Sequence, residues 1–423
     1  MIVSRRFAAS LAAFALLATA SCALPKDRPG GARAPQPAAS TPASHTAPPT
    51  PTLTPTASTT PTPTASATAL PPPVVPPRTF DPKTSVTVTV SGDLLWHMSL
   101  VKAAAADARA RHTGHAYEFG PMLEPVKPII EGADLSICHQ EVPVAPTAKQ
   151  IAGYPAFGSP ADAVRAAKET GFDACTTSSN HSMDKGWNGI VATLDAMQAN
   201  GIVATGTFRT ADERATPAVV TTASGVMVAL VSGTYGLNGY TLPSGRPYAV
   251  AMLDTADMIA RARAARAAGA DIVLAAMHAG TEYQMMPDAL QKKTVQTLTA
   301  SGAFDLVYGH HAHVVQPITQ VNGVWVIYGV SNLIGQMRLN TPAAWDGIIG
   351  KVTFVAKPEG GFTVGQVEYI PLRVTDASKG PPRVLPVNES LRNGTGDRGV
   401  LEASLARTRK GVHALKAPGL VEG

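Results

Sequence analysis

Apolar residues recur along the chain with two periods, and the order of these segments predicts strands that alternate with helices. Residues 85–90 alternate Ser and Thr with Val, which is the period of a half-buried strand. Further strands are expected at 133–138, 172–177, 202–204, 219–222, 226–231, 271–277 and 305–308, and helices at 100–110, 161–170, 187–200, 255–268 and 287–300. Hairpin-like strands follow at 314–319, 324–328, 351–355 and 362–370. This order predicts an α/β fold in which two sheets form a sandwich with flanking helices.

The first 22 residues have the layout of a secretory signal. Arg5 and Arg6 precede an apolar run, 7–20, that is short for a membrane span. The run ends in Thr-Ala-Ser before Cys22, which resembles a bacterial lipobox with Thr in place of the usual Leu. We expect an exported lipoprotein at the outer face of the cell membrane, anchored through a lipid on Cys22. The alternative is cleavage near Ala20 with an incidental Cys22, which would give a secreted protein.

The rest of the chain divides into a spacer, a folded domain and a tail. Residues 23–82 are dominated by Pro, Thr, Ala and Ser and predict a disordered, semi-extended linker. One domain is expected at 83–374, and a polar tail with one short helix, 401–410, at 375–423. The net charge of +5, without basic runs interleaved with aromatics, argues against nucleic acid as a partner.

Cys138 and Cys175 fall in two of the expected strands. They form either a buried pair of thiols or, outside the cytoplasm, a disulfide between neighbouring strands.

Five of the expected strands end in polar clusters that suit a metal centre. The clusters hold Asp93, Glu141, Asn180 with His181, His278, and His311 with His313. Because ligands collect at the carboxyl ends of strands in α/β sheets, we expect these side chains to converge. Two carboxylates, an amide and three imidazoles suit two divalent ions such as Zn, Mn or Fe, bridged by a carboxylate.

Each cluster by itself also has a plain structural explanation. Asp93 could cap a turn, Asn180 could stabilise a tight turn, and His278 could be a structural histidine after an apolar strand. The histidines at 310–313 could form a surface cluster. Metal binding is favoured because such residues recur at the ends of five expected strands.

The motifs together resemble a known family. In order they are Gly-Asp, Glu, Asn-His-x-x-Asp, His-x-Gly-x-Glu-Tyr and Gly-x-His-x-His-Val-Val-Gln, spread over about 85–372. This order is similar to the CapA family of poly-γ-glutamate capsule synthesis proteins, a divergent branch of the calcineurin-like metallophosphatases. The resemblance implies a two-sheet α/β sandwich of metallophosphatase type. The implied metal ligands are Asp93, Glu141, Asn180, His278, His311 and His313, the implied catalytic pair is His181 and Asp184, and the implied substrate contacts are His97, Glu282 and Tyr283.

Three departures from the family and superfamily patterns qualify these roles. The usual Asn-Leu-Glu is here His139-Gln140-Glu141. The Asp-x-His motif of the phosphatases is missing, because His97 lies four residues after Asp93 instead of two. The first metal would therefore lack one ligand. His97 is expected to donate a hydrogen bond to a substrate anion instead. His310 stands at a Gly position and is expected beside the ligands. Tyr283 is equally compatible with a place in the core.

The resemblance implies a protein that handles an anionic envelope polymer such as poly-γ-glutamate, or a phosphoester, in capsule synthesis or export. If the protein is catalytic, it would be a metal-dependent hydrolase with His181 as the proton donor. Two alternatives stay open: a non-catalytic polymer-binding module, and a scaffold subunit of a membrane synthase complex.

Overall fold

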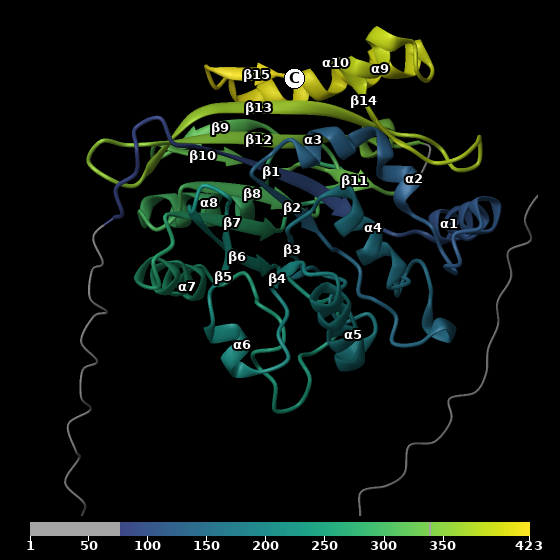
Figure 1. The fold of residues 1–423 in the computed structure, drawn as a ribbon, viewed down its shortest axis with the longest axis horizontal. Helices are drawn as coiled ribbons and strands as arrows, with labels where there is room; N and C mark the ends of the chain where they lie inside the picture. Colours follow the sequence, from purple (N-terminus) through teal and green to yellow (C-terminus); the bar gives the residue numbers. More distant parts are fainter. Residues whose placement is uncertain (1–76, 338–339) are drawn as a thin grey trace, which may run out of the picture. The chain divides into compact units, whose positions relative to one another are not determined.

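The computed structural model describes residues 77–337 and 340–423, and these form two β-sheets with helices on their outer faces (Figure 1). The predicted α/β sandwich is confirmed. The expected signal segment, the lipidated Cys22 and most of the linker lie outside the described residues.

The first sheet has the strand order β14-β13-β12-β1-β2-β3-β4, with β11 paired to β1 and β15 paired to β13. Its strands are β1 (Ser85–Leu94), β2 (Leu135–His139), β3 (Ala174–Thr176), β4 (Val203–Thr205), β11 (Asn332–Ile334), β12 (Asp346–Ala356), β13 (Phe362–Val374), β14 (Val384–Pro386) and β15 (Leu420–Glu422). Strands β1 to β4 run parallel to one another, so their carboxyl ends share one edge.

The second sheet has the order β5-β6-β7-β8-β10-β9. Its strands are β5 (Ala218–Thr221), β6 (Met227–Thr234), β7 (Ile272–His278), β8 (Leu306–His310), β9 (Ile318–Val321) and β10 (Val324–Ile327). Strands β6, β7 and β8 are parallel. Both sheets therefore present parallel strand ends from which loops can build one site.

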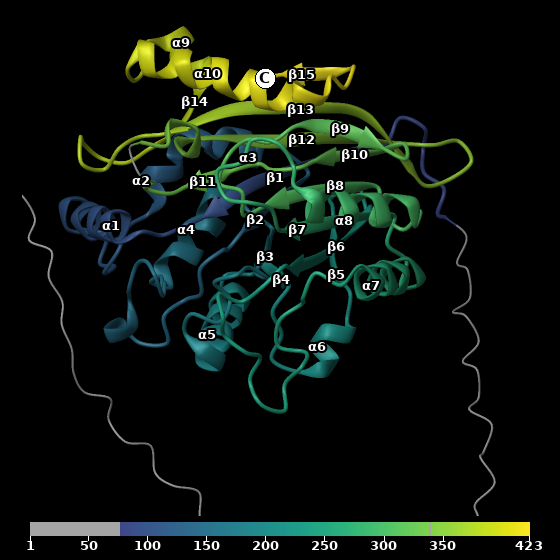
Figure 2. The same cartoon turned by 180° about the vertical axis from the view of Figure 1, so that it is seen from behind.

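Helices cover both outer faces of the sandwich (Figure 2). The longer ones are α1 (Met98–Arg111), α4 (Asp162–Thr170), α5 (Gly186–Ala199), α7 (Thr255–Ala267), α8 (Ala289–Ala300) and α10 (Arg398–Val412), and the shorter ones are α2 (Gly120–Leu123), α3 (Lys127–Glu131), α6 (Ala211–Ala215) and α9 (Val387–Asn393). Among the residues described, no helix is both long and apolar enough to cross a membrane.

Strand alternation explains the layers. Val86, Val88 and Val90 on β1 point into the core between the two sheets, where they meet residues such as Leu274 of β7. Cys138 on β2 points to the opposite side, into the core under helices α1 to α4. The period of two in the sequence thus decides which face of each strand the sandwich buries.

The expectation of a loose tail after residue 374 was wrong. Strand β14 pairs with β13, helices α9 and α10 lie along the edge of the first sheet, and β15 also pairs with β13 (Figure 1). The buried carboxylate of Asp346 on β12 binds Arg373 and, through two hydrogen bonds, Arg407 of α10. Leu401 and Leu405 of α10 are buried. The short helix expected at 401–410 falls within α10, whereas the pairing of β14 and β15 with the sheet was not predicted.

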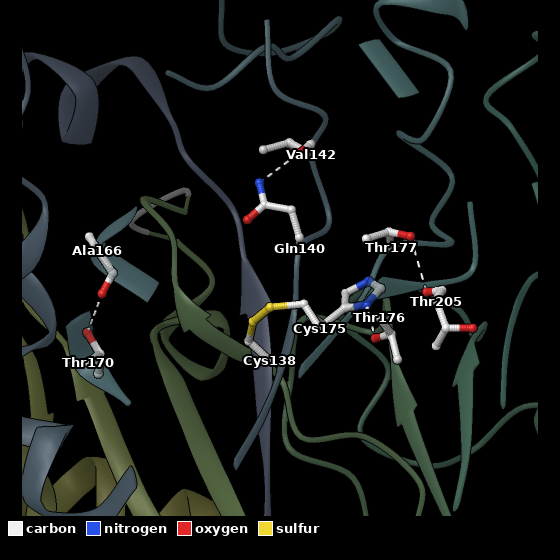
Figure 3. The surroundings of a disulfide bond; sticks show 10 residues. Cys138, Gln140, Val142, Ala166, Thr170, Cys175, Thr176, Thr177 and Thr205 are labelled. Atoms are coloured by element: carbon white, nitrogen blue, oxygen red, sulfur yellow. Dashed lines mark hydrogen bonds between the residues drawn. A yellow bond between two sulfur atoms is a disulfide. The ribbon is translucent and has the colours of Figure 1, made fainter. Parts of the chain in front are cut away.

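Cys138 and Cys175 form a disulfide between adjacent strands β2 and β3, which decides between the two alternatives (Figure 3). The two cysteines are direct partners in the strand register and both are buried. The link therefore fastens the ends of two strands that lead into the candidate site.

Candidate metal centre

The ends of four central strands bring chemically active side chains to one edge of the sandwich. Asp93 of β1 is paired in register with His139 of β2, and His278 of β7 is paired with His310 of β8. Asp93 and His310 also meet across the two sheets, where His310 Nδ1–H donates to Asp93 Oδ1 at 2.8 Å. All four are buried, so the centre lies at the strand ends and not on the surface.

Two glycines let the backbone approach closely enough to form this edge. A Cβ on Gly92 would collide with the carbonyl oxygen of Ser331 and lie 2.6 Å from the backbone nitrogen of Leu333. A Cβ on Gly309 would collide with the carbonyl oxygen of Tyr328. The Gly-Asp and Gly-His steps of the sequence are thus needed because another strand passes where a side chain would be.

The structure brings the six expected metal ligands together in two sets that share Glu141. Potential ligand atoms of Asp93, Glu141 and His313 lie within 4.8 Å of one another, and so do those of Glu141, His278 and His311. Asn180 joins the second set, because its Oδ1 lies 2.7 Å from His278 Nε2. These side chains are thus arranged in a way that is compatible with metal binding.

Unpaired buried atoms show that a cation fits here. Both carboxylate oxygens of Glu141, and the Nδ1 atoms of His278 and His311, are buried without a hydrogen-bond partner among the described residues. A buried ionised group without a partner is costly, so such sites are normally paired or bind metal. The mixture of carboxylate, amide and imidazole suits a divalent transition metal.

Burial and neighbouring charges shift the pKa values of three residues at the centre. Burial alone would raise the pKa of Asp93, but the hydrogen bonds from His310 and His313 hold that pKa well below its usual range. Burial raises the pKa of Glu141 to about 7. Burial would lower the pKa of His313, but the charges of Glu141 and Asp93 raise it to about 10. The protonated imidazole of His313 therefore offsets part of the negative charge of Asp93 and Glu141.

The expected catalytic pair is also in place. His181 Nδ1 lies 2.7 Å from Asp184 Oδ2, and the same oxygen accepts a hydrogen bond from the backbone N–H of Phe157. Burial lowers the pKa of His181, but the bond to Asp184 more than offsets this and raises it. Because a carboxylate accepts the bond, the pairing places a proton on Nδ1 of His181.

The three residues expected to contact substrate lie around this cluster. His97 Nδ1 lies 3.1 Å from the backbone nitrogen of Gln336, and burial lowers the pKa of His97 to about 4, so it is a neutral group rather than a cation. Glu282 is exposed beside His311 and His313. Tyr283 is 44% exposed, with its ring 6.3 Å from that of His313, so it is not a core residue.

Two further residues at the centre were missed. Asn238 accepts a hydrogen bond from Asn180 Nδ2 at 3.1 Å and contacts His181 Nδ1 at 3.3 Å, so it turns the oxygen of Asn180 towards His278. The ring of Tyr235 lies 4.5 Å from that of His311. The sequence marks this loop only by an Asn-Gly turn signal, which says nothing of its neighbours.

With this geometry described, comparison with known proteins identifies the family. Residues 87–337 match the family described as bacterial capsule synthesis protein PGA_cap. The chain belongs to this family. It is similar to the PGA biosynthesis protein CapA of Bacillus subtilis (26% identity over 230 residues, 52% of this chain and 56% of that protein) and to the capsule biosynthesis protein CapA of Bacillus anthracis (26% over 176 residues, 41% and 42%). The matches thus span about half of each relative's length.

Two solved structures have some likeness to this PGA_cap chain. One is the calcineurin-like phosphoesterase YfkN of Bacillus subtilis, at 13% identity and a TM-score of 0.41, covering 76% of this chain and 99% of that one. The other is the NAD nucleotidase of Haemophilus influenzae, at 10% identity and a TM-score of 0.41, covering 80% and 64%.

Proposed function

We propose that this PGA_cap protein is a metal-dependent hydrolase that acts on an anionic cell-envelope polymer, or a phosphoester precursor of it, in capsule synthesis or export. The observation that carries the proposal is the pair of ligand sets that share Glu141. The names of the two relatives support the capsule role, and a polymer similar to poly-γ-glutamate is the substrate class that they suggest.

Divalent metals bound at this centre would polarise a phosphoryl or amide oxygen and activate water. The residues of the chain would perform the remaining tasks. His181, whose pKa is raised by its bond to Asp184, can donate a proton from Nε2 to the leaving group. The neutral imidazole of His97 can donate a hydrogen bond to an anionic substrate, and Tyr283 offers an exposed ring at the entrance.

Metal content and turnover of the purified protein test the proposal together. The wild type, expressed with Zn or Mn supplied, should hold about two divalent ions per chain and hydrolyse at least one member of a panel of phosphomonoesters, phosphodiesters and γ-glutamyl amides. Asn180→Ala and His311→Ala should lose metal and activity together. His115→Ala replaces an exposed histidine on a loop after α1 and should change neither.

The same measurements separate the alternatives. Two bound metals without turnover of any panel member would contradict hydrolysis and favour a binding module for the polymer. Less than one equivalent of metal would refute the metal centre. Full activity in both Asn180→Ala and His311→Ala would show that these residues are not the site.

We also propose that the protein is exported and anchored to the membrane by a lipid on Cys22, where it would work with a membrane synthase. The signal-like segment and the lipobox-like sequence support this. Cys22→Ser should move the protein from the membrane fraction to the medium, and a membrane fraction unchanged by the substitution would refute lipid anchoring at this residue.

A further inference from the structure

His139 is a buried histidine at the centre to which no role has been given so far. It ends strand β2, directly before Gln140 and Glu141, and is paired in register with Asp93. Because side chains alternate along a strand, His139 points away from the disulfide face of Cys138 and towards the second sheet. It therefore lies between the strand ends that carry the expected ligands.

The ring of His139 is held in one orientation. Its Nδ1 lies 2.7 Å from the hydroxyl of Thr176 on the neighbouring strand β3. On one face it stacks on His310, with ring centres 4.1 Å apart and planes inclined by 16°, and its centre lies 4.9 Å from that of His278. A hydrogen bond from one ring nitrogen to a fixed oxygen is the usual device that orients a metal-binding imidazole.

The other ring nitrogen has no partner. Nε2 of His139 is buried and lacks a hydrogen-bond partner among the described residues. Leaving such a buried atom unpaired is costly. A ligand atom of His139 also lies within 4.8 Å of ligand atoms of Asp93 and His278. His139 is therefore close enough to Asp93 to share a metal ion with it, and a carboxylate with an imidazole suits a divalent transition metal.

The expected site of the first metal lacks an imidazole ligand that His139 can supply. The side chain expected two residues after Asp93 is not a histidine, and His97, which comes later, has its Nδ1 against the backbone of Gln336. An imidazole from β2 reaches Asp93 from the adjacent strand instead. We propose that His139 binds a divalent transition metal through Nε2 together with Asp93, and so replaces the imidazole that is missing after β1.

Metal affinity of the full-length protein tests the proposal. Co²⁺ and Zn²⁺ are titrated against a competing chelator, and the visible absorption of the Co²⁺ form is recorded as a measure of its ligand set. His139→Asn, whose side chain is too short to replace the imidazole, should weaken the affected metal by at least about 100-fold, because loss of a ligand exceeds the 10–100-fold effect of an outer partner. The Co²⁺ spectrum should change.

Two further variants make the result specific. Gln140→Met alters the next residue, whose buried amide donates to the carbonyl of Val142 instead of entering the cluster, and should keep wild-type affinity (Figure 3). Thr176→Val keeps the imidazole but removes its hydroxyl partner and should weaken the metal about 10-fold. If circular dichroism shows that His139→Asn does not fold, the metal affinity of Thr176→Val tests the role of His139.

The inference rests on the proposed metal centre, and the two can fail separately. A wild-type protein that holds no metal would refute the centre itself. Suppose instead that the wild type holds metal and that His139→Asn has unchanged metal affinity and an unchanged Co²⁺ spectrum. That result would overturn only the role of His139, and the same result in Thr176→Val would do so if His139→Asn does not fold.

Discussion

Replacing Gly92 with alanine tests whether close strand contact positions the first ligand. The added Cβ would collide with the carbonyl oxygen of Ser331 and lie 2.6 Å from the backbone nitrogen of Leu333, about 0.8 Å closer than the 3.4 Å at which ordinary contact begins. Both atoms belong to backbone, so neither can rotate away. Either β1 or the segment around β11 must move by most of an ångström.

This displacement sets the expected size of the effects. Forcing extra atoms into a packed interior costs about 1–3 kcal/mol of unfolding free energy. Asp93 is the next residue, and ligand distances in metal sites hold within about 0.2 Å, so a shift of this size should also weaken metal binding by about 10-fold or more. Stability and metal affinity should therefore fall together.

Urea unfolding of the metal-free protein and chelator-competition titration measure the two effects. Gly236→Ala is the matched control, because a Cβ there would meet no heavy atom within 4 Å among the described residues. It should behave like the wild type. If Gly92→Ala keeps wild-type unfolding free energy within about 0.5 kcal/mol and binds metal normally, the argument from close approach is refuted.

Three further predictions concern protons, the disulfide and the C-terminal helix. Metal must displace the proton of His313, whose pKa is about 10. The apparent metal affinity should therefore rise about 10-fold per pH unit from pH 7 to 9, and more steeply below pH 7, where Glu141 is also protonated. A metal affinity that does not change with pH would contradict this. Replacing Cys138 and Cys175 together with alanine opens a link across 37 positions and should cost about 4 kcal/mol in urea unfolding, whereas an unchanged midpoint would show that the link adds no stability. Arg407→Ala should cost about 1–3 kcal/mol because it strips two hydrogen bonds from a buried carboxylate. The exposed pair made by Arg398 should cost under about 1 kcal/mol when that arginine is replaced, and equal losses in the two variants would refute the distinction.

The sequence predicted most strands and the place of the candidate ligands because both depend on local patterns. Alternation over 85–90 and the apolar run before His278 each indicate a strand, and a polar residue after an apolar strand falls at the strand's end whatever the rest of the fold does. The family motifs added the order of these residues. The short helix expected at 401–410 lies within α10, but β14 and β15 were missed because strands of three residues are too short to show an apolar alternation.

By itself, then, the sequence determined the α/β class, the residue types of the site and their positions at strand ends. Only the tertiary structure decided which of them meet. Asp93 and His310 are 217 positions apart, and Asn238 reaches Asn180 from a different loop. Glu141 belongs to both ligand sets, and His139 lies among the ligands, because the two sheets pack with these strand ends at one edge. Local patterns specify each strand, but the packing of distant strands sets the distances on which metal chemistry depends.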